Sequence, residues 1–260
     1  MTYEEEIEII IKRKNGVSLK QIMSEYSIKS VKTIYDIIKR DGFKKVGNKK
    51  YKVDDSYFSK IDTEEKAYWL GFLFADGYVR LKNNRSGQLK LKLSSKDRDH
   101  IVLFNNCLSS NYKIKDYIST IKYNDNYISS GVSEVSIYNT NIVKDLINNG
   151  CVNKKTFKIR MPNIEKSLYR HFIRGYFDGD GNIYKSKSRK NSYQVTIASN
   201  FEFNMDILGI INFGKIYKYG NIYLLKFSKI DEIKEFYNYI YNDCKIYLPR
   251  KKKIFELKDD

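Results

Sequence analysis

Apolar residues in the first 45 positions recur three or four residues apart, the spacing of one helix face. Asn15 and Gly16 end the first predicted helix, Ser18 caps the second and Ser30 opens the third. Such a three-helix pattern, with a basic third helix, is typical of a helix-turn-helix that reads the DNA major groove. A small helical bundle without DNA contact is the alternative. The three apolar stripes are Ile7, Ile10 and Ile11; Leu19, Ile22 and Met23; and Val31, Ile34, Ile37 and Ile38.

From Thr63 onward, segments of helical period alternate with segments of period two, and the same order recurs after Pro162. Between residues 88 and 94, leucines alternate with polar residues, two of them lysines, which predicts a strand with one buried and one basic face. The order helix, strands, helix, strands, helix predicts an α+β fold made of two similar halves. Further strands are expected near 112–123, 127–138, 183–187, 193–199, 215–219 and 222–227, and helices near 97–108, 141–148, 203–211 and 231–241.

One motif occurs twice, as WLGFLFADG at 69–77 and as IRGYFDGDG at 173–181. Each copy has small residues four positions apart, which fall on one helix face and let another backbone approach closely. Each copy also ends in an acid followed by glycine, Asp76 and Asp180. Both acids are predicted at helix C-termini, where the helix dipole disfavours a carboxylate unless a cation compensates it. The repeat therefore predicts two closely packed helices with a metal ion beside their acids.

These residues resemble the LAGLIDADG homing endonucleases, in the form that carries both motifs on one chain, over roughly residues 57–253. The resemblance implies two pseudo-symmetric αββαββα halves that form a saddle-like DNA-binding sheet, with both acids at the base of the helix interface. The expected domains are then a helix-turn-helix at 1–45, a basic linker at 46–60, a first half at 61–162 and a second half at 163–260.

The formal charge of +17 indicates a polyanionic partner, because phosphate neutralisation drives nucleic-acid binding. No apolar stretch is long enough to span a membrane, so we expect an intracellular, cytoplasmic protein. With both motifs on one chain, we also expect a monomer. Three widely spaced cysteines without a CxxC pair argue against a zinc site.

Phosphodiester hydrolysis needs an activated water and a neutralised phosphate, and divalent metals supply both. We expect Asp76 and Asp180 to hold Mg²⁺, with Mn²⁺ as a substitute, since one carboxylate per helix plus scissile phosphates can suffice. The resemblance further implies basic residues near the metals, for which Lys155 and Lys251 match best. Asp178 is interpreted as a structural residue or as one that supports the metal-binding acids without touching the metal. Close rivals for the basic role are Lys154, Arg250 and Lys252, and Ser95 and Ser199 match water-organising positions.

DNA contacts are expected from the third helix of the N-terminal module and from the polar faces of the strands, with phosphate contacts outnumbering base contacts. Solvated surface lysine is the alternative at each position. The expected contacts are Lys32, Thr33, Tyr35, Lys39 and Arg40 in the N-terminal module, and Lys82, Arg85, Lys90, Lys92, Lys122, Lys185, Lys187, Arg189, Lys190 and Gln194 in the two halves.

Together the patterns predict a site-specific, Mg²⁺-dependent endonuclease that cuts double-stranded DNA at a long, nonpalindromic target and is encoded by a mobile intron or a free-standing gene. Two alternatives stay open at this point. One is a non-catalytic DNA-binding regulator of the same fold, against which the two retained acids argue. The other is an RNA maturase that acts on intron RNA.

Overall fold

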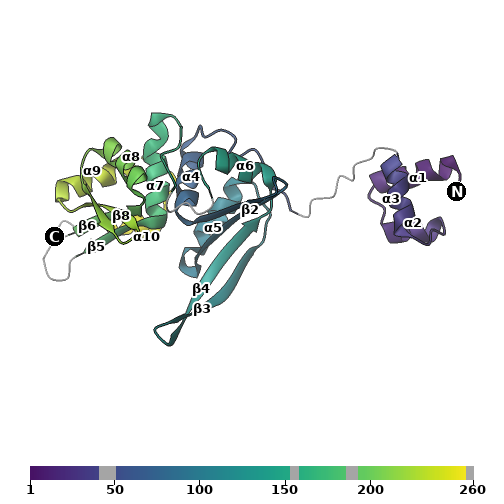
Figure 1. Ribbon diagram of the computed structural model, residues 1–260, viewed down its shortest axis with the longest axis horizontal. Helices are drawn as coiled ribbons and strands as arrows, with labels where there is room; N and C mark the ends of the chain where they lie inside the picture. Colours follow the sequence, from purple (N-terminus) through teal and green to yellow (C-terminus); the bar gives the residue numbers. More distant parts are fainter. Residues whose placement is uncertain (41–50, 153–157, 186–192, 256–260) are drawn as a thin grey trace. The chain divides into compact units, whose positions relative to one another are not determined.

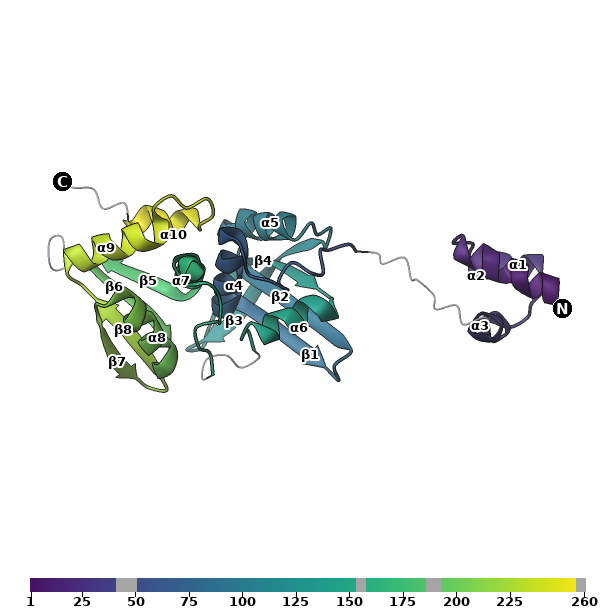
Figure 2. The same cartoon turned by 90° about the horizontal axis from the view of Figure 1, so that it is seen from above.

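The computed structural model describes residues 1–40, 51–152, 158–185 and 193–255. The chain divides into two compact units, Met1–Lys50 and Tyr51–Asp260, which are described separately (Figures 1 and 2). The predicted domain boundaries stay predictions. Tyr57 and Phe58, within the range predicted as linker, are buried in the core of the larger unit.

The smaller unit holds three helices, α1 (Tyr3–Lys14), α2 (Leu19–Glu25) and α3 (Val31–Arg40). Thr2 and Glu5 form a reciprocal capping box at the start of α1, and the Ser18 hydroxyl caps α2. The start of α2 after Ser18 agrees with the cap predicted from the sequence, and the Thr2 cap accounts for the start of α1. The buried core of the unit consists of Ile9, Ile10, Ile22, Ile34, Ile37 and Ile38.

The predicted buried stripe of α1 is wrong at two positions. Ile7 and Ile11 are 40% and 49% exposed, whereas Ile9 is fully buried. Residues 9–11 are three consecutive isoleucines, so spacing alone could not decide which of them faces α2 and α3. On α3, Val31 is likewise 37% exposed.

The larger unit begins with the first half, whose four strands form an antiparallel sheet in the order β1-β2-β4-β3. Alternation of the leucines of β2 with its lysines gives this sheet one buried and one polar face. The elements are α4 (Glu64–Asp76), β1 (Gly77–Lys82), β2 (Ser86–Ser94), α5 (Arg98–Cys107), β3 (Ile114–Tyr123), β4 (Asn126–Ile137) and α6 (Thr140–Asn148).

The second half repeats this plan, with sheet order β5-β6-β8-β7. The predicted α+β class and its two matching halves are confirmed. The final helix, α10, lies in a lysine-rich segment without apolar periodicity and was missed by the sequence pattern. The elements are α7 (Tyr169–Asp180), β5 (Gly181–Lys185), β6 (Tyr193–Ser199), α8 (Phe201–Ile211), β7 (Lys215–Tyr219), β8 (Ile222–Phe227), α9 (Ile230–Tyr241) and α10 (Pro249–Phe255).

Candidate active site at the ends of the paired helices

Helices α4 and α7 lie side by side between the two halves (Figures 1 and 2). A Cβ atom on Gly71 would lie 2.0 Å from the carbonyl oxygen of Phe172, and one on Gly175 would lie 1.9 Å from that of Tyr68. Both distances are far inside van der Waals contact, so only glycine permits this approach. The close packing predicted from the small residues of the motif is confirmed.

Asp76 and Asp180 are the last residues of α4 and α7, and each is followed by the glycine that starts a strand. Both side chains are exposed. A Cβ atom on Gly179 would lie 2.4 Å from the Ala75 Cβ and 3.1 Å from the Asp76 Oδ2. The close helix packing therefore brings one acid against the residue that precedes the other. Two carboxylates at adjoining negative helix ends are arranged so that a cation beside them would be favoured.

Lys251 on α10 is 9% exposed, and its Nζ donates a hydrogen bond to the carbonyl oxygen of Gly181, directly after Asp180. Burial lowers the pKa of Lys251, and the charge of the preceding arginine lowers it further. The carboxylates of Asp178, Asp76 and Asp180 oppose this shift. The ammonium group is thus within electrostatic reach of both motif acids.

The other basic candidates differ in their surroundings. Lys154 and Lys155 lie outside the described residues. The Arg250 Nε donates to both carboxylate oxygens of Asp97, at 2.9 and 2.8 Å. Lys252 places its ammonium 4.3 Å from the centre of the Tyr247 ring. Of these four, the two described residues are engaged with groups other than the motif acids.

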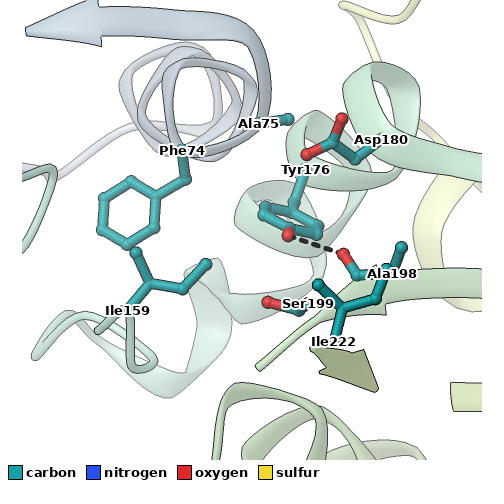
Figure 3. A pocket seen from close by; sticks show the side chains of 8 residues that line it. All are labelled: Phe74, Ala75, Ile159, Tyr176, Asp180, Ala198, Ser199 and Ile222. Atoms are coloured by element: carbon teal, nitrogen blue, oxygen red, sulfur yellow. Dashed lines mark hydrogen bonds between the residues drawn. The ribbon is translucent and has the colours of Figure 1, made fainter. Parts of the chain in front are cut away.

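A cavity of about 180 Å³ opens beside Asp180 (Figure 3). The Tyr176 hydroxyl donates a 3.0 Å hydrogen bond to the Ala198 carbonyl oxygen. Burial raises the pKa of Tyr176, with the charges of Asp180 and Asp76 adding to the effect, so the phenol stays neutral. The cavity lining consists of Phe74, Ala75, Ile159, Tyr176, Asp180, Ala198, Ser199 and Ile222.

The Ser199 Oγ is buried without a well-formed hydrogen bond to any described residue, although it lies beside the Tyr176 phenol. A buried hydroxyl of this kind favours a water molecule in the adjoining cavity. Ser95 differs, because it is exposed at the start of a short 3₁₀ turn, against Gly131. The two serines are therefore not equivalent.

Asp178 is fully buried, unlike the two exposed motif acids. Its carboxylate accepts hydrogen bonds from the hydroxyls of Tyr68 and Tyr241 and from the Leu248 amide. This environment supports its interpretation as a structural residue.

The sequence interpretation missed Arg174, which is fully buried in α7. Its guanidinium donates to the Ile240 and Ile246 carbonyl oxygens and forms a 2.7 Å ion pair with Glu64. The sequence did contain a signal for this residue, because the first motif has the apolar Leu70 where the second motif has Arg174. A charged residue inside an otherwise apolar motif helix indicates a buried partner.

Among the described residues, no three His, Cys, Asp or Glu side chains form a metal-binding group. Asp76 and Asp180 form a pair. Mg²⁺ keeps several waters and binds through one or two carboxylates together with substrate phosphates. The donor set and its position at two negative helix ends therefore fit such an ion.

The strand register sorts the predicted DNA-contact residues by face. Lys82, Lys90 and Lys92 share the face opposite the core, where Lys90 forms a 3.3 Å ion pair with Glu134. Arg85 lies in the turn between β1 and β2.

Lys122 falls on the other face of the first sheet, in line with Asp116, and pairs with Asp125 at 2.9 Å. In the second sheet, Gln194 shares the face opposite the core with Lys226. Lys185 ends β5, with its side chain outside the described part. Lys187, Arg189 and Lys190 also lie outside the described residues.

On α3, the side chains of Lys32, Tyr35 and Lys39 are exposed, and Thr33 is half-buried. Arg40 forms a 2.8 Å ion pair with Glu6 of α1. This pair gives Arg40 a role in joining the helices of the small unit. No helix in the described ranges is long and apolar enough to cross a membrane.

The profile of the LAGLIDADG-like domain matches residues 63–157 and 167–204, more than half of the chain. This match takes in α4 and the order of elements that follows, up to the start of α8. The chain therefore belongs to the LAGLIDADG-like domain family.

Among solved structures, the homing endonuclease I-WcaI bound to its DNA recognition sequence is 13% identical, with 76% of this chain and 90% of that chain covered and a TM-score of 0.54. The I-SmaMI LAGLIDADG homing endonuclease bound to cleaved DNA is 13% identical, with 75% and 87% covered and a TM-score of 0.48. The first of these similarities supports the fold. A replication factor C small subunit from Methanocaldococcus jannaschii is 28% identical over 181 residues, and the chain spans only 9% of its length.

Proposed function

We propose that this chain is a monomeric, site-specific endonuclease that hydrolyses both strands of duplex DNA at a long, nonpalindromic target. One observation supports this proposal most strongly. Asp76 and Asp180 occupy equivalent ends of two helices in contact, and the buried amine of Lys251 lies within their electrostatic reach. The pair belongs to two halves whose sheets differ in strand length, which suits a target without a palindrome.

Asp76 and Asp180 are proposed to hold Mg²⁺, or Mn²⁺ in its place. When bound, a divalent cation activates a water as nucleophile and neutralises charge on the scissile phosphate. Lys251 is proposed to donate hydrogen bonds to the same phosphate, because its buried ammonium lies next to Gly181 and within electrostatic reach of both acids. Lys155 is proposed to act in the first half as Lys251 does in the second.

In the second half, the cavity beside Asp180 is proposed to hold an ordered water that the Ser199 hydroxyl positions. The lysine-bearing sheet faces would hold the DNA backbone, as cationic strands do elsewhere. The small N-terminal unit is proposed to bind duplex DNA through Lys32, Tyr35 and Lys39 of α3 and so to lengthen the recognised site.

The test is cleavage of a randomised duplex library by the full-length protein with Mg²⁺, followed by sequencing of the cut ends. The expected result is one enriched long site that is cut with Mg²⁺ and bound but not cut with Ca²⁺. Asp76→Asn and Asp180→Asn should abolish double-strand cleavage or reduce it to nicking, while binding persists. Enriched binding without cut ends under every metal condition would refute the endonuclease and leave a DNA-binding regulator.

A further inference from the structure

The two halves differ most in one hairpin. Strands β3 and β4 have 10 and 12 residues, whereas their counterparts β7 and β8 have 5 and 6. Residues 132–137 of β4 pair with β2, and residues 126–131 pair with β3 alone. The outer part of this hairpin is therefore a two-stranded ribbon that extends beyond the rest of the sheet (Figure 1).

Two isoleucines form a cross-strand pair near the end of this ribbon. Ile121 lies opposite Ile128, and their side chains are 59% and 49% exposed. The register between β3 and β4 is unbroken, so both point to the same face as Tyr117 and Glu134. That face is the one that carries Lys90 and Lys92 on β2.

Two features indicate which kind of partner this isoleucine pair contacts. The apolar pair continues a face that carries lysines. Tyr117 lies on this face, on the same strand as Ile121, and the Lys92 ammonium is 5.6 Å from the centre of its ring. A polyanion with exposed methyl groups is therefore the matching partner. The major groove of duplex DNA admits a two-stranded β-ribbon, and thymine displays its 5-methyl group there.

We propose that Ile121 and Ile128 read thymine, by packing on its 5-methyl group in the major groove at the outer end of the target bound by the first half. The inference rests on the proposed function, because it assumes that the sheet faces duplex DNA. It assigns apolar readout to one end of the target. The shorter hairpin of the second half instead presents Tyr217 and Tyr219, which are 50% and 68% exposed, on the matching face.

The opposite face of the same ribbon offers a matched control. Ile118 on β3 is 74% exposed and lies in line with Asp116, on the face away from Lys90 and Lys92. Ile118→Ser therefore removes an isoleucine of similar exposure from the same strand, without altering the face assigned to DNA.

The experiment starts from the target recovered by library cleavage and uses the full-length protein with Ca²⁺ to measure binding. Each thymine near the ends of the target is replaced in turn by deoxyuridine, which removes only the methyl group. One or two replacements at one end should raise Kd about fourfold each, the factor that corresponds to burying one methyl group. The double variant Ile121→Ser with Ile128→Ser should bind the thymine duplex and the deoxyuridine duplex equally. Ile118→Ser should bind the thymine duplex more tightly than the deoxyuridine duplex, as the wild type does.

The outcomes separate this inference from the proposed function. A cleaved target that shows no deoxyuridine effect at either end would overturn the thymine contact and leave the endonuclease intact. A deoxyuridine effect that persists in the double variant would overturn it as well. A double variant that loses only self-association would show that the isoleucine pair contacts a second copy of the chain. Failure of the wild-type protein to bind any duplex would refute both proposals.

Discussion

The Tyr68 hydroxyl donates a 2.8 Å hydrogen bond to the Asp178 Oδ2 and so joins the motif helix of one half to that of the other. Asp178 is fully buried and also accepts a 2.7 Å hydrogen bond from the Leu248 amide and one from the Tyr241 hydroxyl. Burial raises the pKa of Asp178 to about 6, against the effect of these donors. A core carboxylate two residues before Asp180 thus connects both motif helices to the segment that precedes α10.

Tyr68→Phe should lower the free energy of unfolding of the larger unit by about 1.5 to 3 kcal/mol, because buried Asp178 loses one of its donors and buried His100 loses its hydrogen-bond partner. Urea unfolding at pH 7 measures this change. Tyr117→Phe is the control, since the Tyr117 hydroxyl donates to Glu134 at 3.1 Å in an exposed position and should cost less than about 1 kcal/mol. Equal losses in the two variants would contradict a special role for the buried bond.

Gly175→Ala should destabilise the larger unit by more than about 3 kcal/mol, because the new Cβ would lie 1.9 Å from the Tyr68 carbonyl oxygen and force the two helices apart. Gly209→Ala, inside α8, meets no atom within 4 Å and should stabilise the protein by about 0.5 to 1 kcal/mol through helix propensity. Urea unfolding of both variants measures the contrast. A neutral or stabilising effect of Gly175→Ala would show that the helix contact can relax.

The sequence predicted the features that depend on local pattern. The repeated motif placed Asp76 and Asp180 at helix ends, and the alternating leucines placed β2 in register with its basic face outward. Small residues four positions apart predicted the close contact at Gly71 and Gly175.

Features that depend on distant partners were not predictable in this way. The partners of Asp178 on α9 and before α10 lie 63 and 70 residues away in the chain. The face of Lys122 follows from the pairing of β3 with β4, which the composition of β3 alone does not fix. Arg40 resembled a free cation on a recognition helix, but its partner Glu6 lies on another helix, 34 residues away.

His100 should make stability fall as the solution becomes acidic. Burial, and secondarily the charge of Arg250, lowers the pKa of His100 to about 4, below the value of 6.5 for a free side chain. The unfolded chain therefore takes up a proton below pH 6.5 that the folded protein takes up only near pH 4. The stabilising contribution is complete above pH 6.5 and is lost as the pH falls through 4.

Between pH 7 and pH 5, this histidine should lower the free energy of unfolding by about 2 kcal/mol, a decrease that the raised pKa of Asp178 opposes. His100→Gln should remove the contribution of the histidine, as urea unfolding at both pH values will measure. Gln keeps a polar atom within reach of the Tyr68 hydroxyl, which lies 2.8 Å from the His100 Nε2. An unchanged pH dependence in the variant would show that other groups produce it.

Lys251→Met should reduce the rate of DNA cleavage about a hundredfold or more, with a smaller effect on the Kd for the target, if the charge that it removes contacts the scissile phosphate as proposed. Single-turnover cleavage and Ca²⁺ binding separate the two quantities. Lys252→Met is the matched control, since the Lys252 ammonium packs on Tyr247. Equal rate losses in both variants would remove Lys251 from the proposed site, and urea unfolding confirms that each variant is folded.

The small unit should contribute affinity through Lys32 and Lys39, two exposed lysines on α3. Replacing both with alanine should weaken binding of the full-length protein to its target and lower the slope of log Kd against log salt by about 2, because each lysine neutralises one phosphate. Lys229→Ala is the control, because Lys229 precedes α9 and pairs with Glu232 at 3.3 Å. A binding titration at several salt concentrations measures the slope. If the slope of the double variant equals that of the wild type, α3 does not hold DNA phosphates, and the small unit serves another purpose.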